Sequence, residues 1–219
     1  MTILNETPHR SDDAGEIIID ADGVLVDYRA PFPQVYKRAF GVDVAYVADR
    51  YHAHNMYGVQ FRDEAEFVRF AESFGEEVWG NLPAMPGAVQ ACERLVAAGH
   101  RLTCVTAIPP VFRNARRRNF EALRFPIERV ICTGRSLDGT NPKLEVLRSR
   151  APVAFVEDLA INFDGVSAGT HKALLHRDQP DTPNTHSLRA LADSEHPDLT
   201  AFVDWWLAGG REAHGGRHA

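Results

Sequence analysis

The chain has 219 residues, of which 44% are apolar and 25% charged, so it can bury a sizeable core without disulfides or a structural metal. Its formal net charge of -6 argues against a nucleic-acid polymer or an anionic membrane as partner, and its three cysteines form no CxxC pair, which argues against a zinc site. The polar N-terminus does not resemble a signal peptide, and no run approaches about 18 apolar residues, so we expect a cytoplasmic protein without a membrane span.

Short apolar runs alternate with helical patterns along the central part of the chain. Continuous apolar runs rich in β-branched residues are typical of parallel strands covered on both faces. Such runs predict five strands, at Glu16–Asp20, Leu102–Thr106, Arg129–Thr133, Val153–Val156 and around Ala173–Leu175.

Apolar residues at helical spacing fill the stretches between these strands. Val89, Cys92, Leu95 and Val96 share one face of a helix predicted over Gly87–Ala98. Two further helices are predicted at Phe112–Leu123 and Lys143–Arg150. This alternation of strands and helices predicts an α/β fold, with a doubly wound parallel sheet.

The segment 28–84 interrupts this rhythm directly after the first strand. It is mostly helical in pattern, at Pro33–Phe40 and Glu64–Phe74, and has no clear strand. We predict a small helical cap at 28–84, of the kind that shields chemistry from water, on an α/β core formed by residues 15–27 and 85–208. The ends, 1–14 and 209–219, lack periodicity and are predicted to be flexible.

Polar residues follow four of the predicted strands, where ligands bind in open α/β sheets. Asp20 and Asp22 close the first strand, and Thr106 and Ala107 close the second. Lys143 comes after the third, and the pair Glu157 and Asp158 ends the fourth. These side chains are therefore expected to converge at one edge of the sheet.

This set of residues suits phosphoryl transfer. Asp20 is a nucleophile that is ionised at neutral pH, and Asp22 is placed to protonate the leaving group. The carboxylates of Asp20 and Asp158, with a backbone carbonyl near Asp22, offer oxygen ligands to Mg²⁺. The phosphoryl oxygens are expected to bind at Thr106, Ala107 and Lys143.

Four short motifs, in order, resemble those of the haloacid dehalogenase-like (HAD) superfamily. Asp20-x-Asp22-Gly23-Val24-Leu25 resembles motif I, Thr106 motif II, Lys143 motif III, and Val156-Glu157-Asp158, with Asp164 downstream, motif IV. The likeness runs from about Ile17 to Leu175. It implies an aspartyl-phosphate intermediate on Asp20, with Asp22 as acid/base. It also implies Asp158 as direct metal ligand, and Glu157 supporting the metal through water.

Several reactions are known for this superfamily. Asp22 argues against a dehalogenase, because a halide leaves without a proton, and against phosphonate hydrolysis, whose enzymes lack that aspartate. A Mg²⁺-dependent phosphatase of a small phosphate monoester remains, with a phosphomutase or other phosphotransferase and a non-catalytic binding protein as alternatives. The oligomeric state is left open.

Within the phosphatases, Asp20–Tyr28, Pro83–Ala91 and His176–Asn184 resemble segments of the 5'(3')-deoxyribonucleotidase group, which implies a nucleotide substrate. Candidate substrate contacts in the predicted cap are Tyr57, Phe61 and Arg62, with His52 and His54, and Phe32 or Tyr36 could stack on a base. The basic run Arg113, Arg116, Arg117 and Arg118 is predicted to form a solvated helix face.

Overall fold

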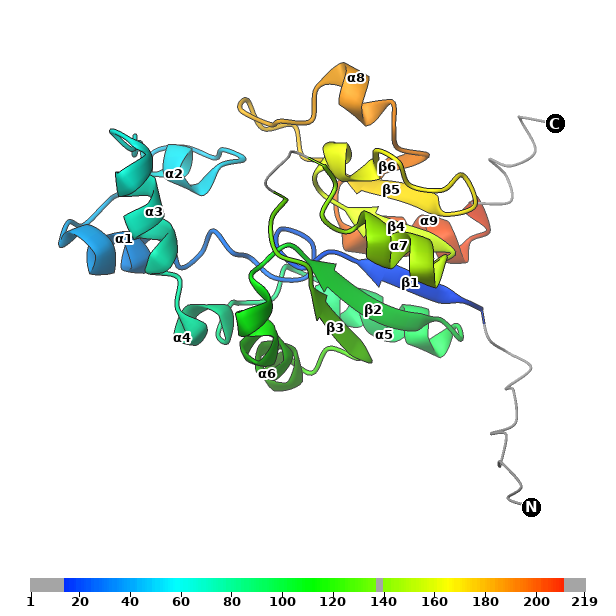
Figure 1. Cartoon of the computed structure of the whole chain (residues 1–219). Coiled ribbons are helices and arrows are strands. Elements are labelled where there is room, and N and C mark those ends of the chain that lie inside the picture. The colour runs from blue at the N-terminus through cyan, green and yellow to red at the C-terminus, as the bar shows by residue number, and fades with distance from the viewer. Residues whose placement is uncertain (1–13, 137–139, 211–219) are drawn as a thin grey trace, which may run out of the picture.

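A computed structural model describes residues 14–136 and 140–210 (Figure 1). The predictions of flexible ends at 1–14 and 209–219 therefore lie outside the described residues, apart from Ala14, Gly209 and Gly210. Within the described ranges, no helix has the length and apolar character needed to cross a membrane.

Six parallel strands form a single sheet with the order β3-β2-β1-β4-β5-β6. β1 lies at the centre, where the strand order reverses, and it pairs with β2 on one side and β4 on the other. This arrangement confirms the predicted α/β class with a doubly wound parallel sheet. The strands are β1 Glu16–Ile19, β2 Arg101–Thr106, β3 Arg129–Cys132, β4 Ala154–Glu157, β5 His171–Leu175 and β6 Ser194–His196.

Two apolar clusters cover the two faces of the sheet, because successive strand side chains point in opposite directions. Ile17 and Ile19 belong to the larger cluster, and Ile18 belongs to the smaller one. The larger cluster contains α5 (Ala88–Ala97), α6 (Arg113–Leu123) and α9 (Leu199–Leu207). The smaller cluster contains residues of α7 (Leu144–Arg150) and of the 3-10 turn η2 (Ala160–Phe163), and Leu188 of α8 (His186–Arg189) packs against it.

Four short helices lie in the chain between β1 and α5, to the left of the sheet in Figure 1. Their contacts are largely aromatic: the ring of Phe32 stacks on Tyr57 at 5.1 Å and lies 4.9 Å from Phe70. The Asp63 side chain caps α3 by accepting a hydrogen bond from the Glu66 amide at 2.8 Å. The four helices are α1 Phe32–Phe40, α2 Ala53–Met56, α3 Glu64–Glu72 and α4 Glu76–Trp79.

Candidate active site at the carboxyl ends of the strands

A cavity of about 260 Å³ lies at the carboxyl ends of β1, β2 and β4. Strands β1 and β4 are adjacent and parallel, so the residues that follow them leave the sheet at the same edge. The cavity is lined by all seven residues predicted for catalysis, phosphate binding or metal binding: Asp20, Asp22, Thr106, Ala107, Lys143, Glu157 and Asp158.

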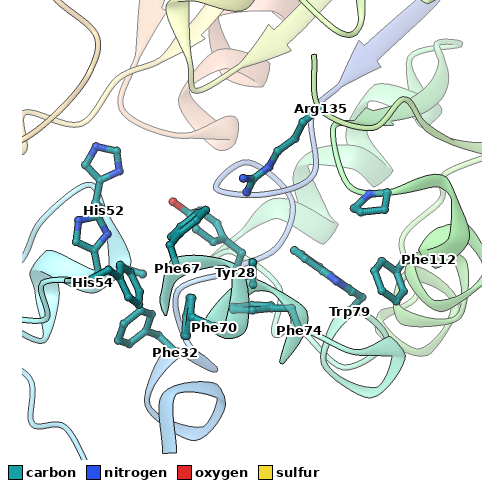
Figure 2. Close-up of a pocket in the computed structure, with 14 residues that line it drawn as sticks. Tyr28, Phe32, His52, His54, Phe67, Phe70, Phe74, Trp79, Phe112 and Arg135 are labelled. Carbon is teal, nitrogen blue, oxygen red and sulfur yellow. The ribbon is translucent and has the colours of Figure 1, made fainter. Parts of the chain in front are cut away.

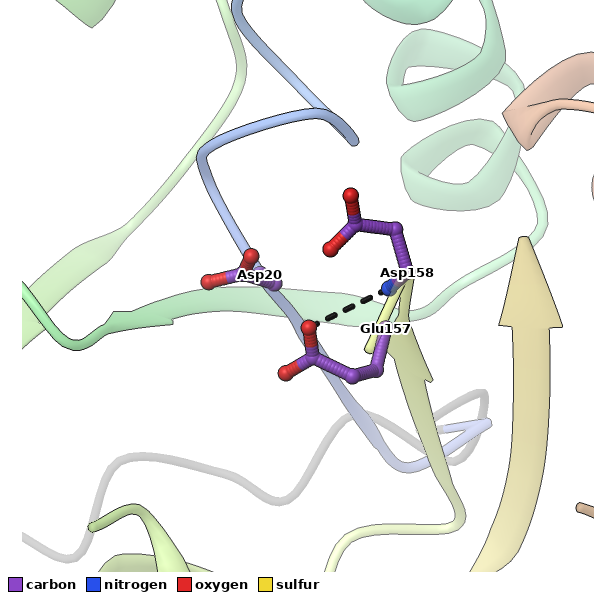
Figure 3. Close-up of side chains that lie close together, drawn as sticks. All are labelled: Asp20, Glu157 and Asp158. Atoms are coloured by element: carbon purple, nitrogen blue, oxygen red, sulfur yellow. Dashed lines mark hydrogen bonds between the residues drawn. The ribbon is translucent and has the colours of Figure 1, made fainter. Parts of the chain in front are cut away.

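Three buried carboxylates gather in this cavity (Figure 3). One oxygen from each of Asp20, Glu157 and Asp158 lies within 4.8 Å of the others. Burial and the negative charge of Glu157 raise the pKa of Asp20 from 3.8 to about 6, although Lys143 opposes the shift. The same two causes raise the pKa of Asp158 well above its ordinary value. Holding these groups together as anions therefore costs free energy, which a bound cation would offset.

Lys143 is the ammonium group within the cluster. It is 1% exposed, and its Nζ donates to Asp20 Oδ1 and to Glu157 Oε2, both at 2.5 Å. Burial acts to lower the pKa of Lys143, but the two carboxylates outweigh it and raise that pKa, so the lysine stays charged. Lys143 thus fixes the orientation of the Asp20 carboxylate and balances one of the negative charges.

The turn after β4 is held by hydrogen bonds from side chains. Glu157 Oε1 accepts from the backbone amides of Asp158 (the dashed line in Figure 3) and Leu159, at 3.1 and 3.2 Å. Asn162 donates to Glu157 Oε2 at 3.1 Å, and Asn184 donates to the Asp158 carbonyl at 2.7 Å. Glu157 is therefore occupied with orienting Lys143 and this turn. Asn162 escaped the sequence analysis, since an isolated asparagine carries no motif, whereas Asn184 closes the segment His176–Asn184 that the sequence singled out without a role for this side chain.

Asp164, the downstream acid of the fourth motif, lies elsewhere. It follows η2 and is exposed, and the described three-carboxylate cluster does not include it. The residue of this turn that reaches the site is Asn162, which lines the cavity.

Gly23 has a positive φ of 88°, in the region that favours glycine. A Cβ on this residue would lie 2.3 Å from Asp158 Oδ2. The glycine after Asp22 therefore allows the turn from β1 to pass directly beside the carboxylate from β4.

Both oxygens of Asp22 accept hydrogen bonds from buried side chains. Thr106 Oγ1 donates to Asp22 Oδ2 at 3.1 Å, and Arg116 Nη2 donates to Oδ1 at 2.6 Å. Burial raises the pKa of Asp22, and Arg116 acts in the opposite direction. A carboxyl group whose pKa is raised and whose orientation is fixed is suited to hold a proton and to give it up to a leaving oxygen.

Arg116 corrects one sequence-based interpretation. Arg113, Arg117 and Arg118 are exposed, as predicted, but the Arg116 side chain is fully buried. Its guanidinium carbon lies 5.4 Å from the ring of Trp79 and 5.8 Å from that of Phe120, within reach of cation–π attraction. The prediction failed because adjacent arginines on a helix point in different directions, and Arg116 points inward, toward Asp22 and Trp79.

Replacing Arg116 tests whether this ion pair supports the site. Arg116→Met leaves the mostly buried Asp22 carboxyl, 19% exposed, without its cation, so the free energy of unfolding is expected to fall by about 3 kcal/mol. The matched control is Arg117→Met, since Arg117 is the exposed neighbour that pairs with Glu121, and it should cost less than about 0.5 kcal/mol. Urea denaturation measures both values, and equal losses would contradict the role given to Arg116.

The donor set of the cavity fits a hard divalent cation. Asp20 and Asp158 offer carboxylate oxygens, and no described cysteine or histidine belongs to the cluster. Oxygen-only ligands suit Mg²⁺ better than softer metals. Among the described residues, two cations, Lys143 and Arg116, form ion pairs within the set of four carboxyl groups from Asp20, Asp22, Glu157 and Asp158, so the site carries an excess of negative charge when all four are ionised.

The predicted substrate contacts of the segment 28–84 are distributed over three places. Phe61 lines a second cavity next to the first, together with His52, His54 and Phe32. Tyr57 instead stacks on Phe32 within the aromatic cluster, and Tyr36 packs on Phe32 and Phe40. Arg62 lies outside both cavities, where its exposed side chain pairs with Glu66.

The loop after β5 connects the site to the segment that carries α1–α4. Arg177 donates to the Gly23 carbonyl at 2.8 Å. A few residues further on, Asp181 accepts hydrogen bonds from the Tyr51 amide at 2.7 Å and from Asn55 Nδ2 at 2.7 Å. Tyr51 itself lines the cavity that holds the three carboxylates. The loop therefore contacts both the turn after β1 and residues 51–55.

No protein-family model and no curated protein matches the chain in sequence. Solved structures match its fold over nearly their full length. A HAD family hydrolase from Deinococcus radiodurans, solved with bound phosphate and sodium, has a TM-score of 0.59 at 16% identity, over 89% of this chain and 95% of its own. L-2-haloacid dehalogenase from Xanthobacter autotrophicus has a TM-score of 0.55 at 15% identity, over 87% and 97%.

A third solved structure is a predicted phosphoglycolate phosphatase from Haemophilus somnus, with a TM-score of 0.58 at 17% identity, over 86% of this chain and 96% of its own. None of these three is described as a nucleotidase. Identities this low establish similarity of fold, and the fold of the chain is that of the HAD hydrolases.

Proposed function

We propose that the protein is a Mg²⁺-dependent phosphatase that hydrolyses a small phosphate monoester through an aspartyl-phosphate on Asp20. The observation that carries the proposal is the pair Asp20 and Asp22 in one cavity, each fixed by a buried cation. Lys143 holds Asp20 at 2.5 Å, and Arg116 holds Asp22 at 2.6 Å. A dehalogenase needs no acid for its leaving halide, so the second carboxyl beside Asp20 favours an ester whose leaving oxygen needs a proton.

The reaction proceeds in two displacements. A carboxylate oxygen of Asp20 attacks phosphorus, the bond from phosphorus to the ester oxygen breaks, and protonated Asp22 gives its proton to the departing alkoxide. Water then attacks the phosphorus of the acyl phosphate while Asp22, now a carboxylate, takes up its proton. Inorganic phosphate leaves, and Asp20 and Asp22 return to their starting states.

Three further residues serve the phosphoryl oxygens. Lys143 supplies positive charge beside Asp20, and Thr106 and Ala107 line the same cavity from the end of β2. Mg²⁺ held by Asp20 and Asp158, with the Asp22 carbonyl as a further ligand, would offset the repulsion between the nucleophile and the phosphate.

Two finer points belong to this proposal: the group that accepts the phosphoryl group from Asp20, and the class of substrate. A phosphomutase would use the same two carboxylates but return the phosphoryl group to a hydroxyl of the substrate instead of water. Likeness to the 5'(3')-deoxyribonucleotidase group makes nucleoside monophosphates one candidate class of substrate. The ratio of free phosphate to isomerised ester separates a hydrolase from a mutase.

The first test is phosphate release from a panel of glycerol, sugar, aryl and nucleoside monophosphates, with and without Mg²⁺. Phosphate release is expected from at least one class, with a rate that falls by about 100-fold or more when Mg²⁺ is removed by a chelator. Folded protein that releases phosphate from no member of the panel, at any Mg²⁺ concentration, would contradict the proposal.

A further inference from the structure

A second and larger cavity, of about 630 Å³, opens beside the catalytic one (Figure 2). We call it the aromatic pocket and define it by six lining residues from α1, α3, α4 and the segments on either side of α3: Phe32, Phe61, Phe67, Phe70, Phe74 and Trp79. Its volume is in the range of pockets that enclose small organic ligands.

The rings of the aromatic pocket form a continuous wall. The ring centroids of Phe61 and Phe70, of Phe70 and Phe74, and of Phe74 and Trp79 lie 5.3, 5.3 and 5.2 Å apart. These separations are typical of aromatic pairs in contact. The wall is therefore already assembled, and a ligand would not have to order these side chains on binding.

The aromatic pocket is continuous with the catalytic cavity. Tyr28, Trp79, Pro109 and Arg135 line both of them. Figure 2 shows Tyr28 and Trp79 between Arg135 and the rings of Phe70 and Phe74. An organic group attached to a phosphate at Asp20 could thus enter the aromatic pocket directly.

Trp79 also connects this pocket to the proposed acid. The Arg116 guanidinium lies over the Trp79 ring at 5.4 Å, and Arg116 in turn donates to Asp22. One indole therefore contributes to the pocket and also packs against the cation that holds the proton donor.

Polar groups are few in this pocket: His52 and His54 on one side, and Tyr28 and Arg135 where it meets the catalytic cavity. His52 and His54 stack on each other at 5.4 Å on one side of the pocket, and burial lowers the pKa of His54, which keeps its ring neutral at neutral pH. A sugar would leave its hydroxyls without partners against the phenylalanine rings, which costs free energy for every buried hydroxyl. A flat apolar ring system would instead gain from burial and ring contacts.

We propose that the organic part of the substrate is a flat, mainly apolar ring system that binds in the aromatic pocket while its phosphate lies at Asp20. This inference rests on the proposed phosphatase function for the placement of the phosphate. Aryl esters and nucleotides both carry an aromatic ring. Because the aromatic pocket has few polar groups, it favours the aryl ester.

The substrate comparison uses kcat/KM for 1-naphthyl phosphate, a nucleoside monophosphate and glycerol phosphate. The naphthyl ester is expected to exceed glycerol phosphate by about 30-fold, from burial of its rings. A nucleoside monophosphate that is turned over faster than the naphthyl ester would overturn the choice of an apolar ring. Equal kcat/KM for the naphthyl and glycerol esters would overturn the role of the pocket.

Two matched pairs of variants on α3 locate the effect. Ala71 lines the pocket and is exposed, so Ala71→Trp should fill the pocket and lower kcat/KM for the naphthyl ester by about 10-fold, with glycerol phosphate unaffected. Ala65→Trp, on the same helix but away from the pocket, is the control. Phe67→Ala should lower kcat/KM for the naphthyl ester alone. Val68→Ala, at an exposed position of the same helix, should change kcat/KM for neither substrate.

A binding experiment separates this inference from the phosphatase proposal. A naphthylmethyl phosphonate resists hydrolysis, so its affinity by calorimetry does not depend on turnover. Binding that Ala71→Trp weakens and Ala65→Trp does not would support the pocket even if no ester were hydrolysed, in which case only the phosphatase proposal fails. Hydrolysis of glycerol phosphate without measurable phosphonate binding would overturn the pocket and leave the phosphatase proposal standing.

Discussion

Replacing Asp20 with asparagine is expected to lower phosphate release by about 10⁴-fold or more, because a carboxamide oxygen is a poor nucleophile and cannot form the acyl phosphate. The fold should survive the change. An amide has the shape of the carboxylate, and its oxygen can still accept the hydrogen bond from Lys143. Steady-state phosphate release measures the loss, and mass spectrometry of acid-quenched protein should find phosphate on Asp20 in the wild type alone.

The control for this prediction is Asp43→Asn. Asp43 is a surface aspartate whose side chain is 81% exposed and pairs with Lys37, so its replacement should leave phosphate release unchanged. Retention of more than about a tenth of the wild-type rate by Asp20→Asn, with an unchanged circular dichroism spectrum, would show that another group attacks phosphorus.

Five of the six strands could be predicted from the sequence because each carries a short, mainly apolar run. Glu16–Ile19 is buried at every position, and so its apolar run carries the signal of a strand covered on both faces. Ser194–His196 was not predicted as β6, since these three polar residues have no apolar pattern and form an edge strand only through pairing with β5. Tertiary pairing overrides local propensity at such a position.

The location of the candidate site at one edge of the sheet could be predicted from topology. The contacts that support its side chains could not. Asp20 and Asp158 each follow a strand of one parallel sheet, so their proximity could be predicted before any distance was known. Arg116 reaches Asp22 across 94 positions of sequence, and Asn184 reaches Asp158 across 26. Contacts of this kind depend on how helices and loops pack on the sheet, and no spacing rule encodes them.

Mg²⁺ is expected to stabilise the protein strongly at pH 7.5, and Asp158→Asn should abolish this effect. Oxygens of the three carboxylates lie within 4.8 Å of one another and repel when ionised, so a cation bound to Asp20 and Asp158 relieves a cost of folding. At 100 times the dissociation constant, binding adds about 2.7 kcal/mol to the free energy of unfolding, or about 5–10 °C in Tm. Thermal denaturation with and without Mg²⁺ measures the shift, with Asp43→Asn as the control.

The pH dependence gives this prediction a second readout. The folded pKa of Asp20 is about 6 against an ordinary 3.8, so the folded state binds this proton more tightly than the unfolded state does. Without metal, the stability from that proton is complete below about pH 4 and is lost as the pH rises through about 6. Mg²⁺ competes with protons for the same oxygens, so its stabilising effect should be small at pH 5 and large at pH 7.5.

In Asp158→Asn one negative charge is gone, and the metal-free protein should lose less stability over this range. A Mg²⁺ shift in that variant as large as in the wild type would instead place the cation away from Asp158.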